Sequence, residues 1–510
     1  MGVSAGFWPE AGWRDELKEC VSVKTTRFGR GEALSWRAVV VGVCLAAALA
    51  TTGCVSRQQV YADIRRNRRE AFKKWKLAKE RQAGVQVVLK GDVTVASAVL
   101  IAMGNNKVLM SILEEKERAL GGVTESLSAI LPRLDMEASY RRLDKVSTFT
   151  VAGVAVPTGH KSNYTVNFVL TQPIFRGGAI SAGIRGAKIS SYVADERVAE
   201  TVQGVAHAAR LGYYDVLLAQ ELVKVSLGDS ELAKAHLADV VKKRKAGVVP
   251  EYDVLRARVE VSNVAAELIE RQNALHLGTT SFLKTLGVSQ ESSINFVDKL
   301  TYEKVSPDLA VSVERAYHDR PEILQAELNV KLAREGLIEA WSGFLPVIDS
   351  SLTHTRARPN PHVSSDDSWG HSWEAGITLR WALFDGLASW GRTQQAKAEL
   401  RRAAIDLAEA EEQVLLEVKQ ALLSLEDTEK FVMSQVDNIE RAEEALRLAR
   451  AGYDAGVNTE IEMLDARQAL SETQALYYQA VHSHQVAKLN ILRATGALKK
   501  AKLRQRAKLK

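Results

Sequence analysis

The spacing of hydrophobic residues along this chain changes between two periods, and two long stretches of helical period dominate it. Residues 176–246 contain no proline and are rich in Ala, Val, Leu, Lys and Glu, and residues 386–455 repeat that design. Each stretch predicts a helix of roughly 105 Å, at a rise of 1.5 Å per residue. Helical propensity alone does not stabilise such a length, so each helix must pack along other helices. Two rods of this size favour a spacer or a tube over a compact catalytic domain.

Each rod ends in a turn and is followed by a returning helix. Gly247 is suited to a helix C-terminus and Pro250 to the first turn of the next helix, which we expect over residues 251–286. The second rod ends in a similar turn at Gly456. Each half of the chain is therefore expected to contain one long helical hairpin.

A period of two, which is typical of β-strands, precedes each rod. Residues 131–140 alternate between apolar and polar, turn-forming residues follow at 153–162, and a second alternating run occupies 164–171. This order predicts a β-hairpin. Residues 373–381 alternate in the same way, whereas residues 345–356 are only weakly patterned. The apolar face of the first run consists of Leu134, Met136, Ala138 and Tyr140.

Alternating strands of about nine to eleven residues with aromatic side chains near their ends are typical of a transmembrane β-barrel wall. A half-buried sheet in a soluble protein is the alternative. Four strands cannot close a barrel, because the smallest barrels have about eight, and lipid does not tolerate open sheet edges. If these strands enter a membrane, copies of the chain must associate. The predicted fold is mainly α, with a β-barrel portion that several copies build together.

An amphipathic helix is expected ahead of each β-hairpin. The first begins after Asp92, which is suited to the N-cap position, and continues to about residue 122. The second occupies residues 308–343, and Asp319-Arg320 stands there where Asn105-Asn106 stands in the first. Each half of the chain therefore consists of a helix, two strands, a long helix and a returning helix.

The two halves are related by nearly constant offsets. Leu131 recurs as Leu345 at an offset of 214, whereas Gly177 recurs as Gly386 at an offset of 209. The offset shrinks across the hairpin loop, where insertions are tolerated. The chain is thus interpreted as an internal duplication. The expected divisions are a leader at 1–53, a basic segment at 54–90, a first repeat at 91–300, a second repeat at 307–497 and a basic tail at 498–510.

The N-terminal region has the pattern of an export signal. Three arginines precede an apolar run at residues 38–50, which is shorter than the roughly 20 residues that span a membrane. Its length is that of the hydrophobic part of a signal peptide. The run ends in LATTGC, with Cys54 last. This resembles a bacterial lipoprotein signal, which implies acylation of Cys54 after cleavage. The alternative is cleavage near Ala50, with Cys54 left as a free thiol.

Composition and charge exclude several kinds of site. All three cysteines precede residue 55, so no disulfide framework or cysteine-based metal site is expected after it. The formal charge is +6, and the tail from Lys499 onward carries seven Lys or Arg residues and no acid. The rest of the chain therefore lacks the basic surface of a nucleic-acid-binding protein. The scattered histidines form no catalytic arrangement, and there is no phosphate-binding loop. We predict no enzymatic activity, no metal site and no cofactor.

Four sequence features, in this order and partly twice over, resemble the TolC family of outer-membrane efflux proteins. They are LPRLDMEASY, TQPIFRGG, the turn AGVVPEYDVLRARVEV with its copy AGVNTEIEMLDARQAL, and the closing LNILRATGAL. The resemblance covers residues 89–497 and implies an exit duct of a tripartite pump or type I secretion system. It also implies a homotrimer in the outer membrane, with a twelve-stranded barrel continued by a periplasmic helical tube. The implied partners are a periplasmic adaptor protein, an inner-membrane transporter and outer-membrane lipid.

The same resemblance implies functional residues near the ends of the helical hairpins. Glu462 and Asp465 correspond to acidic residues that line the constriction of the tube, although a solvated acidic face is the alternative. Polar contacts that close the tip map to Tyr453, Asn458 and Asp253. The turns that dock the adaptor map to Ala246, Gly247, Val248, Ala455, Gly456 and Val457.

A second hypothesis, from another class, is a periplasmic coiled-coil scaffold without a pore. The predicted strands distinguish the two, because a scaffold needs no membrane-spanning sheet. A scaffold would form soluble helical oligomers without detergent, whereas a duct would need detergent and would conduct ions.

Overall fold

The computed structural model describes residues 61–62, 64–73, 89–146, 148–151, 154–157, 159–363 and 366–498. The chain divides into two compact units, Met1–Val85 and Gln86–Lys510. The described part of the first unit is helical. The expected leader and Cys54 lie outside the described residues, as does the expected tail except for its first residue.

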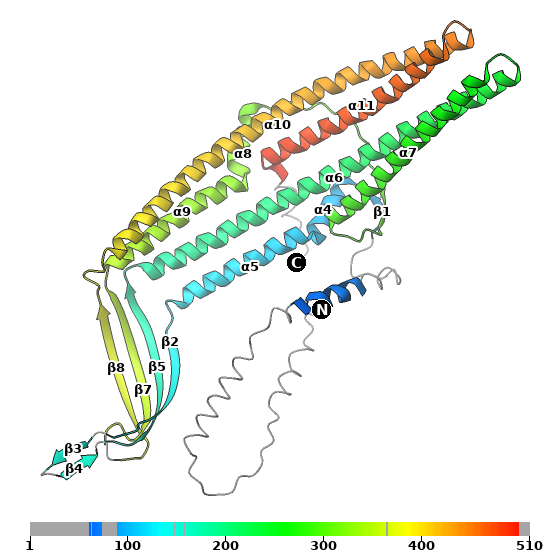
Figure 1. Ribbon diagram of the computed structural model, residues 1–510. Coiled ribbons are helices and arrows are strands. Elements are labelled where there is room, and N and C mark those ends of the chain that lie inside the picture. The colour runs from blue at the N-terminus through cyan, green and yellow to red at the C-terminus, as the bar shows by residue number, and fades with distance from the viewer. Residues whose placement is uncertain are drawn as a thin grey trace, which may run out of the picture. The chain divides into compact units, whose positions relative to one another are not determined.

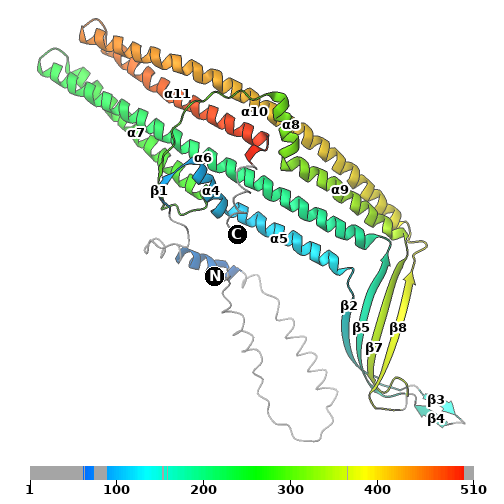
Figure 2. The same ribbon diagram turned by 180° about the vertical axis from the view of Figure 1, so that it is seen from behind.

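The second unit is built on two long helical hairpins. Helix α6 (Ala179–Lys245) and helix α10 (Ala388–Asp454) have 67 residues each. Helix α7 (Glu251–Leu286) returns along α6, and α11 (Glu460–Ala494) returns along α10. The turns that join each pair lie at the end away from the sheet (Figures 1 and 2). The rods and their returning helices, which the sequence predicts, are confirmed.

The helix expected from Asp92 is wrong in its start and in its continuity. Asp92 lies in strand β1 (Lys90–Val93), and Thr94 caps α4 (Val95–Asn105) in a reciprocal capping box with Ser97. Because the Asn106 side chain accepts hydrogen bonds from the amides of Val108 and Leu109, a new helix α5 (Lys107–Ser128) begins there. The second repeat has the same break, between α8 (Leu309–Asp319) and α9 (Pro321–Trp341), which is followed by the short 3₁₀ helix η1 (Ser342–Phe344).

Among the described residues, no single helix combines the length and the apolar character needed to cross a membrane. The consecutive helices α4 and α5, bent by 45° at their junction, meet that test together on length and composition alone.

The four predicted strands form one antiparallel sheet in the order β2-β5-β7-β8. Their bounds are β2 (Arg133–Arg142), β5 (Ser162–Arg176), β7 (Val347–Arg358) and β8 (Gly370–Arg380). The sheet lies at one end of the long helices (Figure 1). Within the described residues, β2 and β8 each have a neighbour on one side only.

Two small sheets were not predicted. Strand β1 pairs in parallel with β6 (Ser293–Phe296), about 200 residues later in the chain. The loop expected at residues 153–162 contains part of a short hairpin, formed by β3 (Thr148–Val151) and β4 (Val154–Pro157). Both pairings involve only four residues per strand, too few to give a distinct alternating pattern.

The parallel pair closes a core at the middle of α6. Tyr213 of α6 is fully buried, and its hydroxyl donates a hydrogen bond of 2.8 Å to the Val93 carbonyl. Its ring packs against Phe282 and Phe296, with centroids 5.9 and 5.1 Å away. Burial raises the pKa of Tyr213 to about 12, so the hydroxyl keeps its proton and remains a donor. This core ties β1 and the segment that follows α7 to the first rod.

Two glycines allow the helix breaks to pack closely. Gly287 ends α7 at φ +74, and a Cβ there would overlap the Asn105 carbonyl, where α4 ends. Gly496 has φ +68, and its Cβ would lie 2.8 Å from the Asp319 carbonyl oxygen, where α8 ends. Equivalent glycines therefore hold the same junction in both halves.

We predict that Gly287→Ala destabilises the protein by at least about 1 kcal/mol, because it combines an unfavourable φ with an overlap against backbone. Gly228→Ala is the matched control, since Gly228 lies inside α6 with no atom near its missing Cβ. The control should be neutral or stabilising, because alanine favours helix. Thermal unfolding followed by circular dichroism measures both. Equal midpoints for the two variants would contradict the packing described.

Candidate functional site at the hairpin tips

Both helical hairpins turn through the same backbone motif. The Val248 amide donates to the Lys243 carbonyl and the Gly247 amide to the Arg244 carbonyl, both at 2.9 Å. The second turn repeats this, from Val457 to Gly452 at 2.8 Å and from Gly456 to Tyr453 at 3.1 Å. The glycines adopt φ +77 and +74, as this type of helix ending requires. All six residues implicated in adaptor docking are exposed; they are Ala246, Gly247, Val248, Ala455, Gly456 and Val457.

The two acidic residues expected at the constriction lie in the first two turns of α11, and both are exposed. Glu462 also has a local role. Its carboxylate accepts a 2.8 Å hydrogen bond from the Thr459 amide, and the Thr459 hydroxyl accepts one from the Glu462 amide. This capping box starts α11. Asp465 forms no hydrogen bond or ion pair through its side chain within the described residues, so its carboxylate is open to solvent.

Tyr453, which is one of the residues expected to close the tip, lies between the two hairpins, next to Lys243 and His236 of α6. The Lys243 ammonium, on α6, lies 4.3 Å from the centre of the Tyr453 ring, and 3.5 Å from a carboxylate oxygen of Asp454. Burial raises the pKa of Tyr453, although Lys243 opposes the shift. Burial would lower the pKa of Lys243, but the neighbouring Asp239, Tyr453 and Asp454 outweigh it and raise that pKa. The lysine is therefore held in its charged form beside the ring.

Asn458 and Asp253 are not brought together within one copy of the chain. The Asn458 amide folds back onto its own hairpin and donates to the Ala449 carbonyl at 3.4 Å. Among the described residues, no hydrogen bond or ion pair joins the Asp253 side chain to another group. A contact between the two, if it closes the tip, must form in another arrangement of the hairpins or between copies.

A second contact between the hairpins lies close to Tyr453. His236 of α6 and Glu460 of α11 approach to 2.9 Å between Nε2 and Oε1, and each side chain is only 10% exposed. The His236 ring also meets the Tyr453 ring edge to face, with centroids 5.9 Å apart. His236, Lys243, Tyr453 and Glu460 therefore form one polar cluster, here called the tip cluster, between α6 and the second hairpin.

Further from the tip, a buried arginine joins three helices. Arg467 of α11 is 6% exposed and donates 2.8 Å to Asp229 of α6 and also to Glu260 of α7. Burial raises the pKa of Asp229, although the Arg467 guanidinium opposes the shift. The Arg467 Nε is buried without a partner. This charged triad fixes the second hairpin against the first.

The sequence interpretation identified neither the tip cluster as a whole nor the triad. One signal was available for Arg467, because it follows Met463 and Leu464 at helical spacing and so shares their buried face. Its partners lie more than 200 residues away in sequence. Pairing at that distance has no local pattern.

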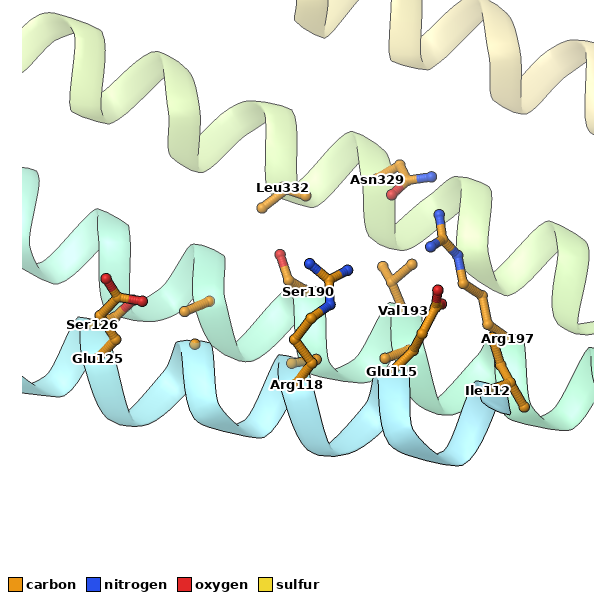
Figure 3. A pocket seen from close by; sticks show the side chains of 14 residues that line it. Ile112, Glu115, Arg118, Glu125, Ser126, Ser190, Val193, Arg197, Asn329 and Leu332 are labelled. Carbon is orange, nitrogen blue, oxygen red and sulfur yellow. The ribbon is translucent and has the colours of Figure 1, made fainter. Parts of the chain in front are cut away.

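One pocket in the described part of the chain is open to solvent rather than enclosed. This pocket of about 480 Å³ lies between α5, α6 and α9, and Figure 3 shows charged side chains of Glu115, Arg118 and Arg197 projecting at its walls. Ligand sites are mostly apolar with few polar groups. In the described part of the chain, no three His, Cys, Asp or Glu residues are grouped to hold a metal ion.

We predict that Arg467→Ala destabilises the protein by about 3 kcal/mol, because it leaves two carboxylates facing each other without their cation. Arg447→Ala is the control, since Arg447 pairs with Glu444 on an exposed face and should change stability by less than about 1 kcal/mol. The loss in Arg467→Ala should shrink as the pH falls through the raised pKa of Asp229, because protonation removes the repulsion. Thermal unfolding at several pH values tests this, and equal effects of both variants would contradict it.

Comparison with known proteins places this geometry in a family. The model of the outer membrane efflux protein family matches residues 101–287 and 312–497. The outer membrane protein TolC of Vibrio cholerae is 22% identical over 409 residues, covering 78% of this chain and 89% of that protein. The alkaline protease secretion protein AprF of Pseudomonas aeruginosa is 21% identical over 413 residues, covering 78% and 82%. The CmeC outer membrane channel of Campylobacter jejuni has a TM-score of 0.69 at 16% identity, covering 81% of this chain and 88% of that one. This chain therefore belongs to the outer membrane efflux protein family.

Proposed function

We propose that three copies of this outer-membrane exit channel assemble into one duct, whose periplasmic tip opens when an adaptor and an inner-membrane transporter dock. The observation that carries the proposal is the four-stranded sheet with two open edges at the end of two 67-residue helices. In lipid each open edge exposes backbone groups that must be paired. Association of three copies supplies twelve strands, the number that the family resemblance implies.

The helices supply the periplasmic part of the duct. A helix of 67 residues is about 100 Å long at 1.5 Å per residue, which carries the tip far from the membrane. Helices α5, α6, α9 and α10 pack in that order side by side, so each copy provides one section of a helical wall. Which side of this wall faces the lumen is determined by how the sheet closes into a barrel.

The gate of the proposed duct is the tip. Glu462 and Asp465 are exposed in one copy, and three copies would bring six such carboxylates around one axis. A ring of acids in a narrow pore favours cations. The tip cluster, with Tyr453 at its centre, is proposed to hold the closed state, and Asn458 and Asp253 remain proposed partners in it. The exposed turns at residues 246–248 and 455–457 are the proposed adaptor-docking sites.

Acylation of Cys54 would add a second attachment to the outer membrane. The proposal rests on the sequence before Cys54, which lies outside the described residues. The whole chain needs no catalytic group or bound cofactor for passive conduction, and we propose that it is not an enzyme.

The first test of the gate is the paired substitution Glu462→Gln with Asp465→Asn. Glutamine keeps an acceptor for the Thr459 amide, so the start of α11 is preserved while the charge is removed. In planar bilayers we expect weaker selectivity for cations and less block by multivalent cations than in the parent channel. Unchanged selectivity and block would remove these residues from the gate and leave the duct itself intact. A soluble, pore-free oligomer would instead favour the scaffold.

The second test breaks the tip cluster with His236→Ala and Lys243→Ala together. If these contacts hold the hairpins closed, the variant should conduct more than the parent, by several-fold in single-channel recordings. Lys224→Ala is the control, because Lys224 pairs with Glu221 inside α6 and does not belong to the tip cluster. An equal conductance for parent, control and variant would show that the cluster does not limit opening.

A further inference from the structure

We infer one residue register for the pairing of β8 with β2 of the neighbouring copy in the proposed trimer, and the internal repeat determines this register. The inference rests on the proposed function, since it needs a second copy beside the first. It adds the residues that meet and the charges that select the register.

The two hairpins of the sheet provide a test of the repeat inside one chain. Arg133 is opposite Thr171 in the first hairpin, and Val347 is opposite Arg380 in the second. These pairs are related by the offset of 214 before the loop and 209 after it. The same offsets relate the other end of the hairpins, where Arg142 opposite Ser162 becomes Arg356 opposite His371. The two hairpins therefore share one register over their whole length.

Besides the two hairpin pairings, the sheet contains the pairing of β5 with β7. The equivalent of this pairing would join β8 to β2, and a single chain does not form it. Applied to this pairing, the same offsets place β8 against β2 of the neighbouring copy. Thr171 opposite Ser351 becomes Arg380 opposite Glu137 of the neighbour. Val169 opposite Thr353 becomes Thr378 opposite Ser139 of the neighbour.

Charge supports this register. Glu137 and Arg380 are both exposed, and neither side chain forms an ion pair or hydrogen bond within the described residues. In the inferred register they face each other across the two edges. Opposite charges in directly opposed positions stabilise a strand pair, whereas like charges destabilise it.

A second charged contact lies at the end of the strands. Within the chain, Arg176 of β5 binds Asp349 of β7 at 2.7 Å. The equivalent of Arg176 is Asp385, and the register places it opposite Arg133 of the neighbour, which is the equivalent of Val347. The equivalents of Arg176 and Asp349 are thus two acids, Asp385 and Asp135 of the neighbour, and Arg133, which binds Asp135 at 2.9 Å within its own chain, supplies the cation between them.

The apolar faces also match. Ile377 faces Tyr140 of the neighbour and Leu379 faces Ala138, so apolar residues meet on one side of the sheet. A slip of one residue would place each apolar side chain on the polar face. A register shift of two residues keeps each side chain on its own face of the sheet but separates Asp385 from Arg133. In one direction, this shift places Asp385 opposite Asp135 of the neighbour. Among nearby registers, the inferred one alone keeps both charged contacts and both faces.

The junction with the helices gives an independent observation. A Cβ on Gly177 would lie 2.7 Å from the Ser342 carbonyl oxygen and 2.9 Å from the Leu345 side chain, so this glycine permits a close approach within the chain. Its equivalent Gly386 has a similar φ, +65, but no atom near it. The equivalents of Ser342 and Leu345 are Ser128 and Leu131, which are exposed at the opposite edge. The neighbouring copy brings these residues to Gly386.

Apolar exposure is largest where this contact is missing. Leu383 and Phe384 follow β8 and are 83% and 80% exposed. Their equivalents in the first repeat, Ile174 and Phe175, are 55% and 40% exposed, and Phe175 lies opposite Ile348 of β7. In the inferred register Phe384 lies opposite Leu134 of the neighbour, which is itself 68% exposed. The two exposed edges therefore cover each other.

Cysteine cross-linking of the full-length chain in detergent tests the register. Thr378→Cys with Ser139→Cys should give a covalent three-chain species on a non-reducing gel after mild oxidation, because directly opposed residues lie within disulfide reach. These positions lie on outer strands of one sheet, three strand spacings apart, so the bond cannot form inside one copy. The matched control, Thr378→Cys with Arg141→Cys, places the thiols on a diagonal of about 7–8 Å, which is too far for a disulfide. The parent chain, with Cys20, Cys44 and Cys54, and each single variant are run beside them.

Three outcomes decide the matter. Cross-linking of the first pair well above the control pair supports the register. Cross-linking of the control pair, or of neither pair in a particle whose mass is that of three chains, overturns the register and leaves the proposed duct intact. A particle with the mass of one chain overturns both the register and the proposed duct.

As a second measurement, Arg380→Glu should lower the temperature at which the oligomer dissociates, and adding Glu137→Arg should restore that temperature. Failure of the restoration would remove the charged contact from the inference.

Discussion

The architecture of this protein depends on the hydrogen bonding of backbone amides and carbonyls at the two edges of one small sheet. Inside one copy, β5 and β7 are paired on both sides, whereas β2 and β8 are paired on one side only. In water such edges are a liability, and in lipid they are not tolerated at all. In the proposed trimer another copy supplies the missing partner strand. Closing the edges in this way would also enclose the lumen of the channel.

Internal duplication explains how one chain can build a regular wall. The helix breaks, the glycines that pack against them and the tip turns occur twice, with the same local geometry each time. In the inferred register, the contacts between the repeats within a chain are the pattern for the contacts between chains. The differences between the repeats matter equally, because they place unlike charges on the two outer edges. A particular neighbour edge is thereby favoured over pairing of like edges.

The two long hairpins are joined by an apolar cluster near the middle of the rods and by polar contacts nearer the tip. The cluster around Tyr213 includes Val432, Ala480 and Val481 of the second hairpin, and a further cluster surrounds Val418. Towards the tip, the Arg467 triad and the tip cluster join the two hairpins. Charged contacts of this kind are directional, and they are lost together when the helices separate. Such a design suits the gate that we propose at the tip.

The sequence predicted those features that local patterns determine. The rods follow from long proline-free segments, the main strands from alternation, and the tip turns from Gly247 and Gly456. The start of the first helix was misjudged because Asp92 and Thr94 are both good capping residues, and only the pairing of β1 with β6 removes Asp92 from that role. Arg467 and His236 were missed because their partners lie more than 200 residues away. Contacts that depend on how distant helices approach each other have no signature in a single sequence.

The most direct measurement of the central claim is the molar mass of the full-length chain, purified in detergent and determined by light scattering after size-exclusion chromatography. If the open edges of β2 and β8 must be paired, the folded protein has the mass of three chains after subtraction of the detergent. A stable particle of one chain that retains the helix and strand content of the structure would contradict this account.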